Sequence, residues 1–223
     1  MCGRFTLTVN ANTIQQVFPW LEIPPDSISA RYNIAPSQPI PVIPNTGENK
    51  LDYFIWGLIP FWAKDSKIGS RMINARSETL EEKPSFRTPF RHKRCLILAD
   101  GFYEWASVAN QKRKIPHYIQ LESKMPFAFA GLWEEWNASD GSLLRTAAII
   151  TTDSNPIIAP IHNRMPVILP IKTHDIWLDS KITNPDDLKP LLKPFTEKKM
   201  VKFPVSNLVN NPSNDLPNCI LPI

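Results

Sequence analysis

Residues 146–152 read Thr-Ala-Ala-Ile-Ile-Thr-Thr, a segment with the length and β-branched composition of a buried strand. Five other segments share this length and character, and turn residues separate most of them. Six or more strands linked mainly by turns favour an α+β fold, with antiparallel β-sheets forming a barrel-like core. The other five predicted strands are residues 51–56, 95–99, 118–121, 127–130 and 166–169.

Two short helices are predicted at the periphery of this core. Residues 12–18 (NTIQQVF) have apolar side chains at helical spacing, and Pro19 ends the segment. Near the C-terminus, Asn184 is a suitable N-cap, and Pro185 suits the first helical position before two aspartates of the first turn. The apolar side of this second helix is formed by Leu188, Leu191 and Leu192.

The length and composition are those of one globular domain. Of the 223 residues, 43% are hydrophobic and 21% are charged, which is enough apolar sequence for one substantial core. The 23 prolines are roughly twice the usual share and follow no repeat, so they indicate many short segments that end at proline. We therefore expect a single domain over residues 1–223, with residues 207–223 as a tail packed on its body.

Several classes of protein are disfavoured by the sequence. It has no apolar run near the roughly 20 residues that cross a bilayer, and its first twenty residues lack the apolar stretch of a secretory signal. We expect a cytoplasmic protein, associated with the nucleoid if bacterial. Three widely spaced cysteines without a CxxC pair argue against a disulfide framework and a metal site. We expect a monomer that needs no cofactor; its net charge of +4 permits a polyanionic partner without requiring one.

Cys2 stands where removal of the initiator methionine would expose it as the N-terminal residue. An N-terminal cysteine carries an α-amine with a pKa of about 7.7 to 8.0 beside a thiol with a pKa of about 8.5. The amine attacks an aldehyde to form a Schiff base, and the thiol then closes on the same carbon to form a five-membered thiazolidine. An internal cysteine lacks the amine and cannot do this. The residue type and position therefore indicate chemistry on aldehydes.

Six motifs along the chain resemble those of the SRAP family, the SOS-response-associated peptidases, whose members sense abasic sites in single-stranded DNA. The match keeps its order from residue 2 to beyond residue 210. The motifs are residues 1–5 (MCGRF), 32–38 (YNIAPSQ), 56–62 (WGLIPFW), 74–79 (NARSET), 100–105 (DGFYEW) and 161–166 (IHNRMP).

The resemblance implies four catalytic residues. Cys2 would be the covalent nucleophile, and Asn74 would hold the lesion. Glu104 would deprotonate the Cys2 amine and shuttle protons, while His162 would act on the ring oxygen of the closed deoxyribose. The implied product is a thiazolidine crosslink that shields the lesion. Strand cleavage by a lyase reaction and self-removal of Met1 are further implied activities.

Five residues are candidates for contact with DNA. Arg4, Arg76 and Arg164 lie in the motifs close to Cys2, Asn74 and His162, and arginines there suit the phosphates that flank a lesion. Trp62 and Trp105 would stack on bases or wedge beside the gap left by a missing base. Core packing is the alternative for these two tryptophans, because a chain of this size buries most of its seven.

Two other functions remain open at this point. Cys2, His162 and Asn74 have the residue types of a thiol peptidase, in which the histidine is the base and the amide orients it. A non-catalytic module that binds single-stranded DNA would need only the arginines and tryptophans. A denaturation-resistant adduct with abasic DNA, absent with intact DNA, is required only by the crosslinking function.

Overall fold

Five strands of the larger β-sheet close into a barrel. The structure is a computed structural model that describes residues 2–24, 26–107 and 113–223. In the barrel, β10 pairs with β4 in parallel, and the other pairings are antiparallel, including the closing pair of β9 with β10. The predicted α+β class with a barrel-like core is confirmed. The barrel strands, in order, are β10 (Leu143–Asp153), β4 (Asp52–Trp56), β3 (Pro39–Pro44), β6 (Arg94–Ala99) and β9 (Phe127–Asn137).

Three short strands extend this sheet. β5 (Asn74–Arg76) pairs in parallel with β10, while β11 (Arg164–Pro166) pairs antiparallel with the end of the same strand. β12 (Ile168–Leu169) pairs with β9. Strand β10 therefore carries β5 and β11 near its C-terminal end, which brings two motifs far apart in sequence onto one strand.

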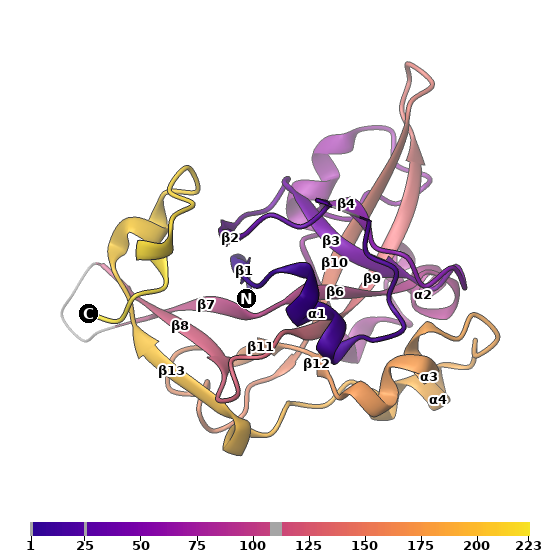
Figure 1. The fold of residues 1–223 in the computed structure, drawn as a ribbon. Helices are drawn as coiled ribbons and strands as arrows, with labels where there is room; N and C mark the ends of the chain where they lie inside the picture. The colour runs from indigo at the N-terminus through magenta and orange to yellow at the C-terminus, as the bar shows by residue number, and fades with distance from the viewer. Residues whose placement is uncertain (1, 25, 108–112) are drawn as a thin grey trace.

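The second sheet is antiparallel and lies beside the barrel (Figure 1). The chain passes into it from the barrel where β6 is followed directly by β7, at the buried residue Asp100. Strand β1 lies between β2 and β7, so the N-terminal segment runs through the middle of the molecule. The strands, in order, are β13 (Met200–Pro204), β8 (Ile115–Leu121), β7 (Gly101–Ala106), β1 (Phe5–Leu7) and β2 (Arg31–Ile34).

Both predicted helices are confirmed, and two others were not predicted. The first is α1 (Ala11–Val17), capped by the Asn10 side chain. The second, α4 (Pro185–Leu188), has the expected Asn184 cap but passes after one turn into a 3-10 turn. The additional helices are α2 (Pro84–His92) and α3 (His174–Leu178). The 3-10 turns are Ser66–Arg71, Ser77–Thr79, Ile171–Thr173, Lys189–Leu191, Glu197–Lys199, Asn207–Asn210 and Pro217–Cys219.

All six predicted strands correspond to strands of the structure, and the one at 166–169 covers the end of β11 and all of β12. Six further strands of the described residues were missed, namely β1, β2, β3, β5, β7 and β13. β3 is the clearest case, because prolines 39, 41 and 44 argue against a central strand. In the structure, β6 pairs with β3 only from Val42 onward. Pro39 and Pro41 therefore have a neighbouring strand, β4, on one side only. On the other side no strand that the structure describes is paired with them, so a missing N–H group costs no ladder hydrogen bond on that side.

Aromatic packing fixes the N-terminal strand against the barrel. The ring of Phe5 is fully buried, with its centroid 5.1 Å from that of Trp56 and 5.8 Å from that of Phe129, both in edge-to-face geometry. Burying a phenylalanine side chain is worth about 1.5 to 3 kcal/mol, and edge-to-face contacts add to this. Phe5 therefore anchors the segment that carries Cys2. Within the described ranges, no helix is long and apolar enough to cross a membrane.

Candidate active site

Cys2 lies buried at the start of the N-terminal segment, and Asn74 holds its backbone. The Asn74 side-chain amide donates a hydrogen bond of 2.8 Å to the carbonyl oxygen of Cys2. Asn74 begins β5, where pairing with Ile149 of β10 fixes its position. The Cys2 thiol donates a long contact of 3.8 Å to the Arg4 carbonyl oxygen. The structure thus brings together two predicted site residues that are 72 positions apart.

Glu104 lies on β7 beside the N-terminal segment. Phe5 pairs with Phe102, and the Tyr103 N–H donates to the Arg4 carbonyl at 3.0 Å, so the chain before Phe5 runs antiparallel toward Glu104. Burial raises the pKa of the Glu104 carboxyl above its ordinary value. Burial also raises the pKa of the Cys2 thiol, and the negative charge of Glu104 raises it further. The carboxylate is therefore close enough to act on Cys2 electrostatically.

His162 precedes β11, and its tautomer is set by the backbone. The Arg164 N–H donates a hydrogen bond of 3.0 Å to Nδ1 of His162, so the neutral ring carries its proton on Nε2. Burial, together with the positive charges of Lys114 and Arg164, lowers the pKa of His162. Near neutral pH the ring is therefore uncharged, and its Nε2–H is a hydrogen-bond donor.

Lys114 places a positive charge near the candidate site, and it was not among the predicted site residues. Its ammonium group lowers the pKa of both Glu104 and His162, so the two residues share one electrostatic neighbourhood. Lys114 is exposed and lies just before β8. No motif pointed to it, because it belongs to a basic run that is typical of a solvated loop.

The three predicted DNA-binding arginines have different surroundings. The Arg164 side chain is only 9% exposed, and its guanidinium donates to both carboxylate oxygens of Glu78, at 2.7 and 2.9 Å. It also donates to the Thr151 carbonyl at 2.6 Å and to Asp153 at 3.2 Å. Arg76, by contrast, is exposed at the end of β5. Of these two arginines, Arg76 is therefore the one that lies open to a phosphate, whereas Arg164 ties β11 to the turn after β5.

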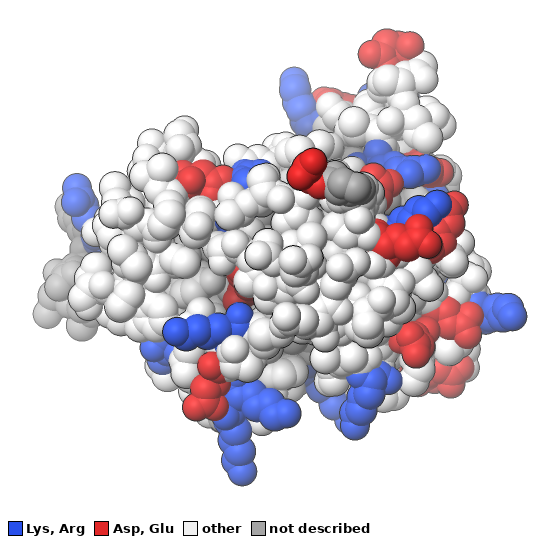
Figure 2. Space-filling view, in the orientation of Figure 1, with Lys and Arg blue, Asp and Glu red and all other residues white. Residues whose placement is uncertain are grey.

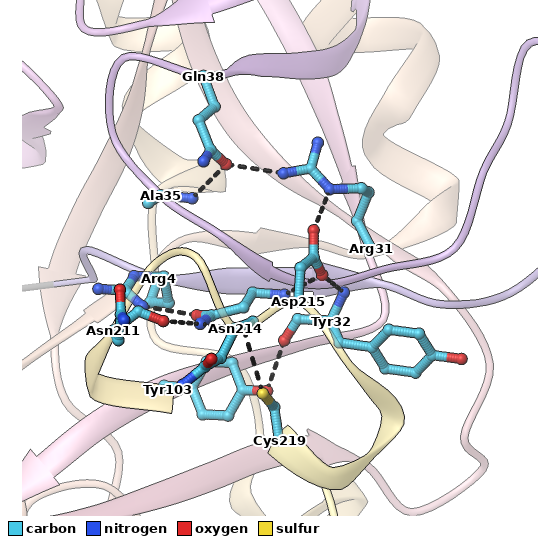
Figure 3. Close-up of polar contacts among 11 residues, drawn as sticks. Arg4, Arg31, Tyr32, Ala35, Gln38, Tyr103, Asn211, Asn214, Asp215 and Cys219 are labelled. Carbon is cyan, nitrogen blue, oxygen red and sulfur yellow. Dashed lines mark hydrogen bonds and ion pairs between the residues drawn. The ribbon is translucent and has the colours of Figure 1, made fainter. Parts of the chain in front are cut away.

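Arg4 is half-buried and packed against the C-terminal part of the chain (Figure 3). Its Nη1 donates to the Asn33 side-chain oxygen and to the Val209 carbonyl, each at 2.6 Å. The guanidinium carbon lies 5.8 Å from the centre of the Trp105 ring, and the Trp105 indole N–H donates to Asn210 at 2.7 Å. Arg4 and Trp105 therefore form a packed unit beside Cys2 and Glu104.

Trp62 lies in an exposed loop between β4 and the 3-10 turn Ser66–Arg71. It is 49% exposed, beside the exposed Phe61, and it lines a hollow of about 650 Å³ together with basic residues of the following turn. The loop is tied to the β9–β10 hairpin, since the Trp136 indole donates to the Ala63 carbonyl at 2.7 Å. On the face shown in Figure 2, basic and acidic side chains both lie around the rim and the centre is largely uncharged. The basic residues lining the hollow are Lys64, Lys67 and Arg71.

The cysteines and acidic residues show no metal centre within the described ranges. No group of three or more His, Cys, Asp or Glu side chains is arranged there to hold a metal ion. Cys2, Cys95 and Cys219 are all free, buried thiols.

Comparisons with known proteins agree over nearly the whole chain. The family model described as "SOS response associated peptidase (SRAP)" matches residues 1–212. The chain is 50% identical over 222 residues to the abasic site processing protein YoqW of Bacillus subtilis, covering 99% of each chain. It is 31% identical to the abasic site processing protein HMCES of Xenopus tropicalis, covering 100% of this chain and 78% of that protein. A crystal structure of a Bacteroides thetaiotaomicron protein matches with a TM-score of 0.88 at 29% identity, over 100% of both chains.

Proposed function

The chain belongs to the SOS response-associated peptidase (SRAP) family, and on that premise we propose that it senses abasic sites in single-stranded DNA and traps them covalently through Cys2. Covalent trapping requires Cys2 to be the N-terminal residue, so Met1 must first be removed. Met1 lies outside the described residues. The observation that carries the proposal is the placement of Cys2, with its carbonyl bound by Asn74 and its thiol in the field of the buried Glu104. The relatives named above as abasic site processing proteins support the substrate.

The proposed reaction begins at the α-amine. Glu104 removes a proton from the ammonium, and the neutral amine attacks C1′ of the open-chain sugar to give a carbinolamine. Loss of water gives the protonated imine, with Glu104 returning the proton that the departing hydroxyl takes. The Cys2 sulfur then bonds to the same carbon, and the thiol proton goes to the imine nitrogen. One water leaves overall, and no oxidant, metal or cofactor is consumed.

His162 serves the step before attack. An abasic deoxyribose is mainly a closed hemiacetal, so its ring oxygen must accept a proton as C1′ becomes an aldehyde. The neutral His162 ring presents Nε2–H as the donor for this oxygen, because the Arg164 backbone N–H occupies Nδ1. Asn74 orients the attacking terminus through its bond to the Cys2 carbonyl.

The state of the thiol favours trapping over proteolysis. A peptidase cysteine attacks as a thiolate, and its pKa is lowered by a neighbouring imidazolium or helix N-terminus. Here burial and Glu104 raise the pKa of Cys2 instead, so the thiol keeps its proton. In the trapping reaction the amine is the first nucleophile, so no thiolate is needed before the imine forms. A purely non-catalytic DNA-binding module would not need a carboxylate buried beside the terminus.

A denaturing gel tests the proposal. We expect the processed protein to form an adduct that survives heating with single-stranded DNA containing one abasic site, and none with the same strand intact. Capping the aldehyde with methoxyamine before mixing should prevent the adduct. Mass spectrometry should first show that the protein lacks Met1. If that protein forms no adduct with abasic DNA, or forms as much adduct with intact DNA, the proposal is contradicted.

Electrostatic contacts with DNA give a further prediction. Arg76→Ala should weaken binding to single strands of any sequence and flatten the dependence of log K on log salt by about 0.7, the value for one phosphate contact on a single strand. Arg164→Ala should instead lower the melting temperature, because it leaves Glu78 and the Thr151 carbonyl without their partner. Fluorescence anisotropy over a salt series measures the slope, with the exposed Lys172→Ala as control. An unchanged slope for Arg76→Ala would place the DNA path elsewhere.

A further inference from the structure

The proposed nucleophile stands at the chain terminus, where backbones are poorly ordered unless other groups tie them down. Beside the packing of Arg4 against Trp105, three hydrogen-bonded contacts hold residues 2–4. Asn74 binds the Cys2 carbonyl, and the Tyr103 N–H binds the Arg4 carbonyl at 3.0 Å. The third is the Arg4 side chain, whose Nη1 is bound by Asn33 and by Val209. This last contact depends on a part of the chain about 200 residues away.

That part is the C-terminal segment, residues 207–219, which crosses β2 (Figure 3). Asn33 is fully buried, and its Nδ2 donates to the carbonyls of Val209, Asn211 and Asn214 at 3.2, 3.1 and 2.7 Å. The carboxylate of Asp215 accepts the Asn33 N–H at 3.0 Å and also pairs with Arg31. One amide therefore binds the segment through Nδ2 and Arg4 through Oδ1.

We propose that Asn33 is a positioning residue for the trapping reaction: with the Val209 carbonyl of the C-terminal segment it fixes Arg4, and through Arg4 it fixes Cys2. The inference rests on the proposed function. Its physical basis is orientation, since misplacing a reacting group by about 1 Å can cost about 100-fold in rate. A group that only stabilises the fold would alter the melting temperature without altering the rate of the folded protein.

The test compares Asn33→Ala with Asn33→Asp in single-turnover crosslinking to abasic single-stranded DNA. Asn33→Ala removes both functions of the amide, and we expect the rate constant at saturating DNA to fall about 10- to 100-fold. The DNA concentration for half-maximal rate should stay within about threefold of wild type, because the variant keeps the Arg4 and Arg76 side chains. Asn33→Asp restores an acceptor for Arg4 alone and should regain several-fold of the lost rate.

Asn45→Ala is the matched control. Asn45 is also a buried amide with three bonds: it accepts from the Arg94 N–H at 3.0 Å and the Trp133 indole at 3.1 Å, and donates to the His92 carbonyl at 3.2 Å. Its partners lie on β6, β9 and the end of α2, whereas Asn33 lies on β2 of the other sheet. Its loss should lower the melting temperature and leave the rate constant of the folded protein unchanged.

The measured rate constants distinguish a positioning role for Asn33 from a purely structural role. A rate constant for Asn33→Ala within about twofold of wild type would overturn the inference. Equal rates for Asn33→Ala and Asn33→Asp, explained by the fraction of each variant that is folded, would also overturn it. If Asn33→Ala does not fold, Asp215→Asn loosens the same segment from a partly exposed position and should slow the reaction several-fold. An unchanged rate in that variant, with increased proteolysis at the segment, would also overturn it. If the wild-type protein itself forms no adduct, the proposed function fails instead.

Discussion

Replacing Cys2 by serine is expected to remove the heat-stable adduct completely. The serine keeps the α-amine, so a Schiff base with the abasic aldehyde still forms, but the thiol that closes the ring is gone. The remaining imine reverses in water or proceeds to β-elimination and strand cleavage. Sodium borohydride should therefore trap an adduct in Cys2→Ser, while untreated samples show free protein and cut DNA on a denaturing gel.

Cys95→Ala is the appropriate control for the loss of a buried thiol. Cys95 lies inside the barrel on β6, where burial raises the pKa of its thiol as it does for Cys2. The variant is expected to lose some stability through the small cavity and to keep the heat-stable adduct. A Cys2→Ser protein that forms this adduct as well as wild type, without borohydride, would rule out the thiazolidine.

Glu104→Gln is expected to slow crosslinking by about 10²- to 10⁴-fold near neutral pH, the range typical of general acid–base assistance. The wild-type rate should rise with pH through a pKa above the ordinary glutamate value of about 4.3, because burial raises the pKa of Glu104 and only its deprotonated form accepts the amine proton. Glutamine preserves the shape without this group. The variant should recover as pH rises past about 8, where the free amine loses its proton to solvent. Timed denaturing gels over a pH series measure both profiles.

His162→Ala separates ring opening from amine activation. An open-chain aldehyde carried on DNA needs no ring opening, so it should bypass most of the defect of His162→Ala and little of that of Glu104→Gln. Rescue of both variants to the same extent, or of neither, would show that the division of roles between Glu104 and His162 is wrong.

Local signals predicted part of the regular structure. The Asn184 cap before Pro185 marked the start of α4, and short apolar runs marked the barrel strands. Prolines account for two misses. Pro89 lies inside α2, and proline in a helix interior normally ends the helix. The prolines of β3 are tolerated because their side of the strand is unpaired at that point, which no local pattern reveals.

The sequence motifs name candidate site residues but do not give their arrangement. The motif resemblance indicated Cys2, Asn74, Glu104 and His162, and the structure supplies the Asn74 bond to Cys2 and the His162 tautomer. Asn33 lies in the quoted motif YNIAPSQ, but its partners are carbonyl groups of the C-terminal segment, and a backbone carbonyl has no sequence signature. The burial of Arg164 against Glu78 depends likewise on pairing between distant strands.

Intact mass of the purified adduct, followed by peptide mapping, tests the central claim most directly. We expect a species whose mass equals that of the protein without Met1 plus the abasic oligonucleotide less one water. The DNA-derived mass should map to the peptide that begins with Cys2, and that peptide should carry no free thiol. An adduct that retains Met1, or whose DNA maps to a lysine or to another cysteine, would contradict the account.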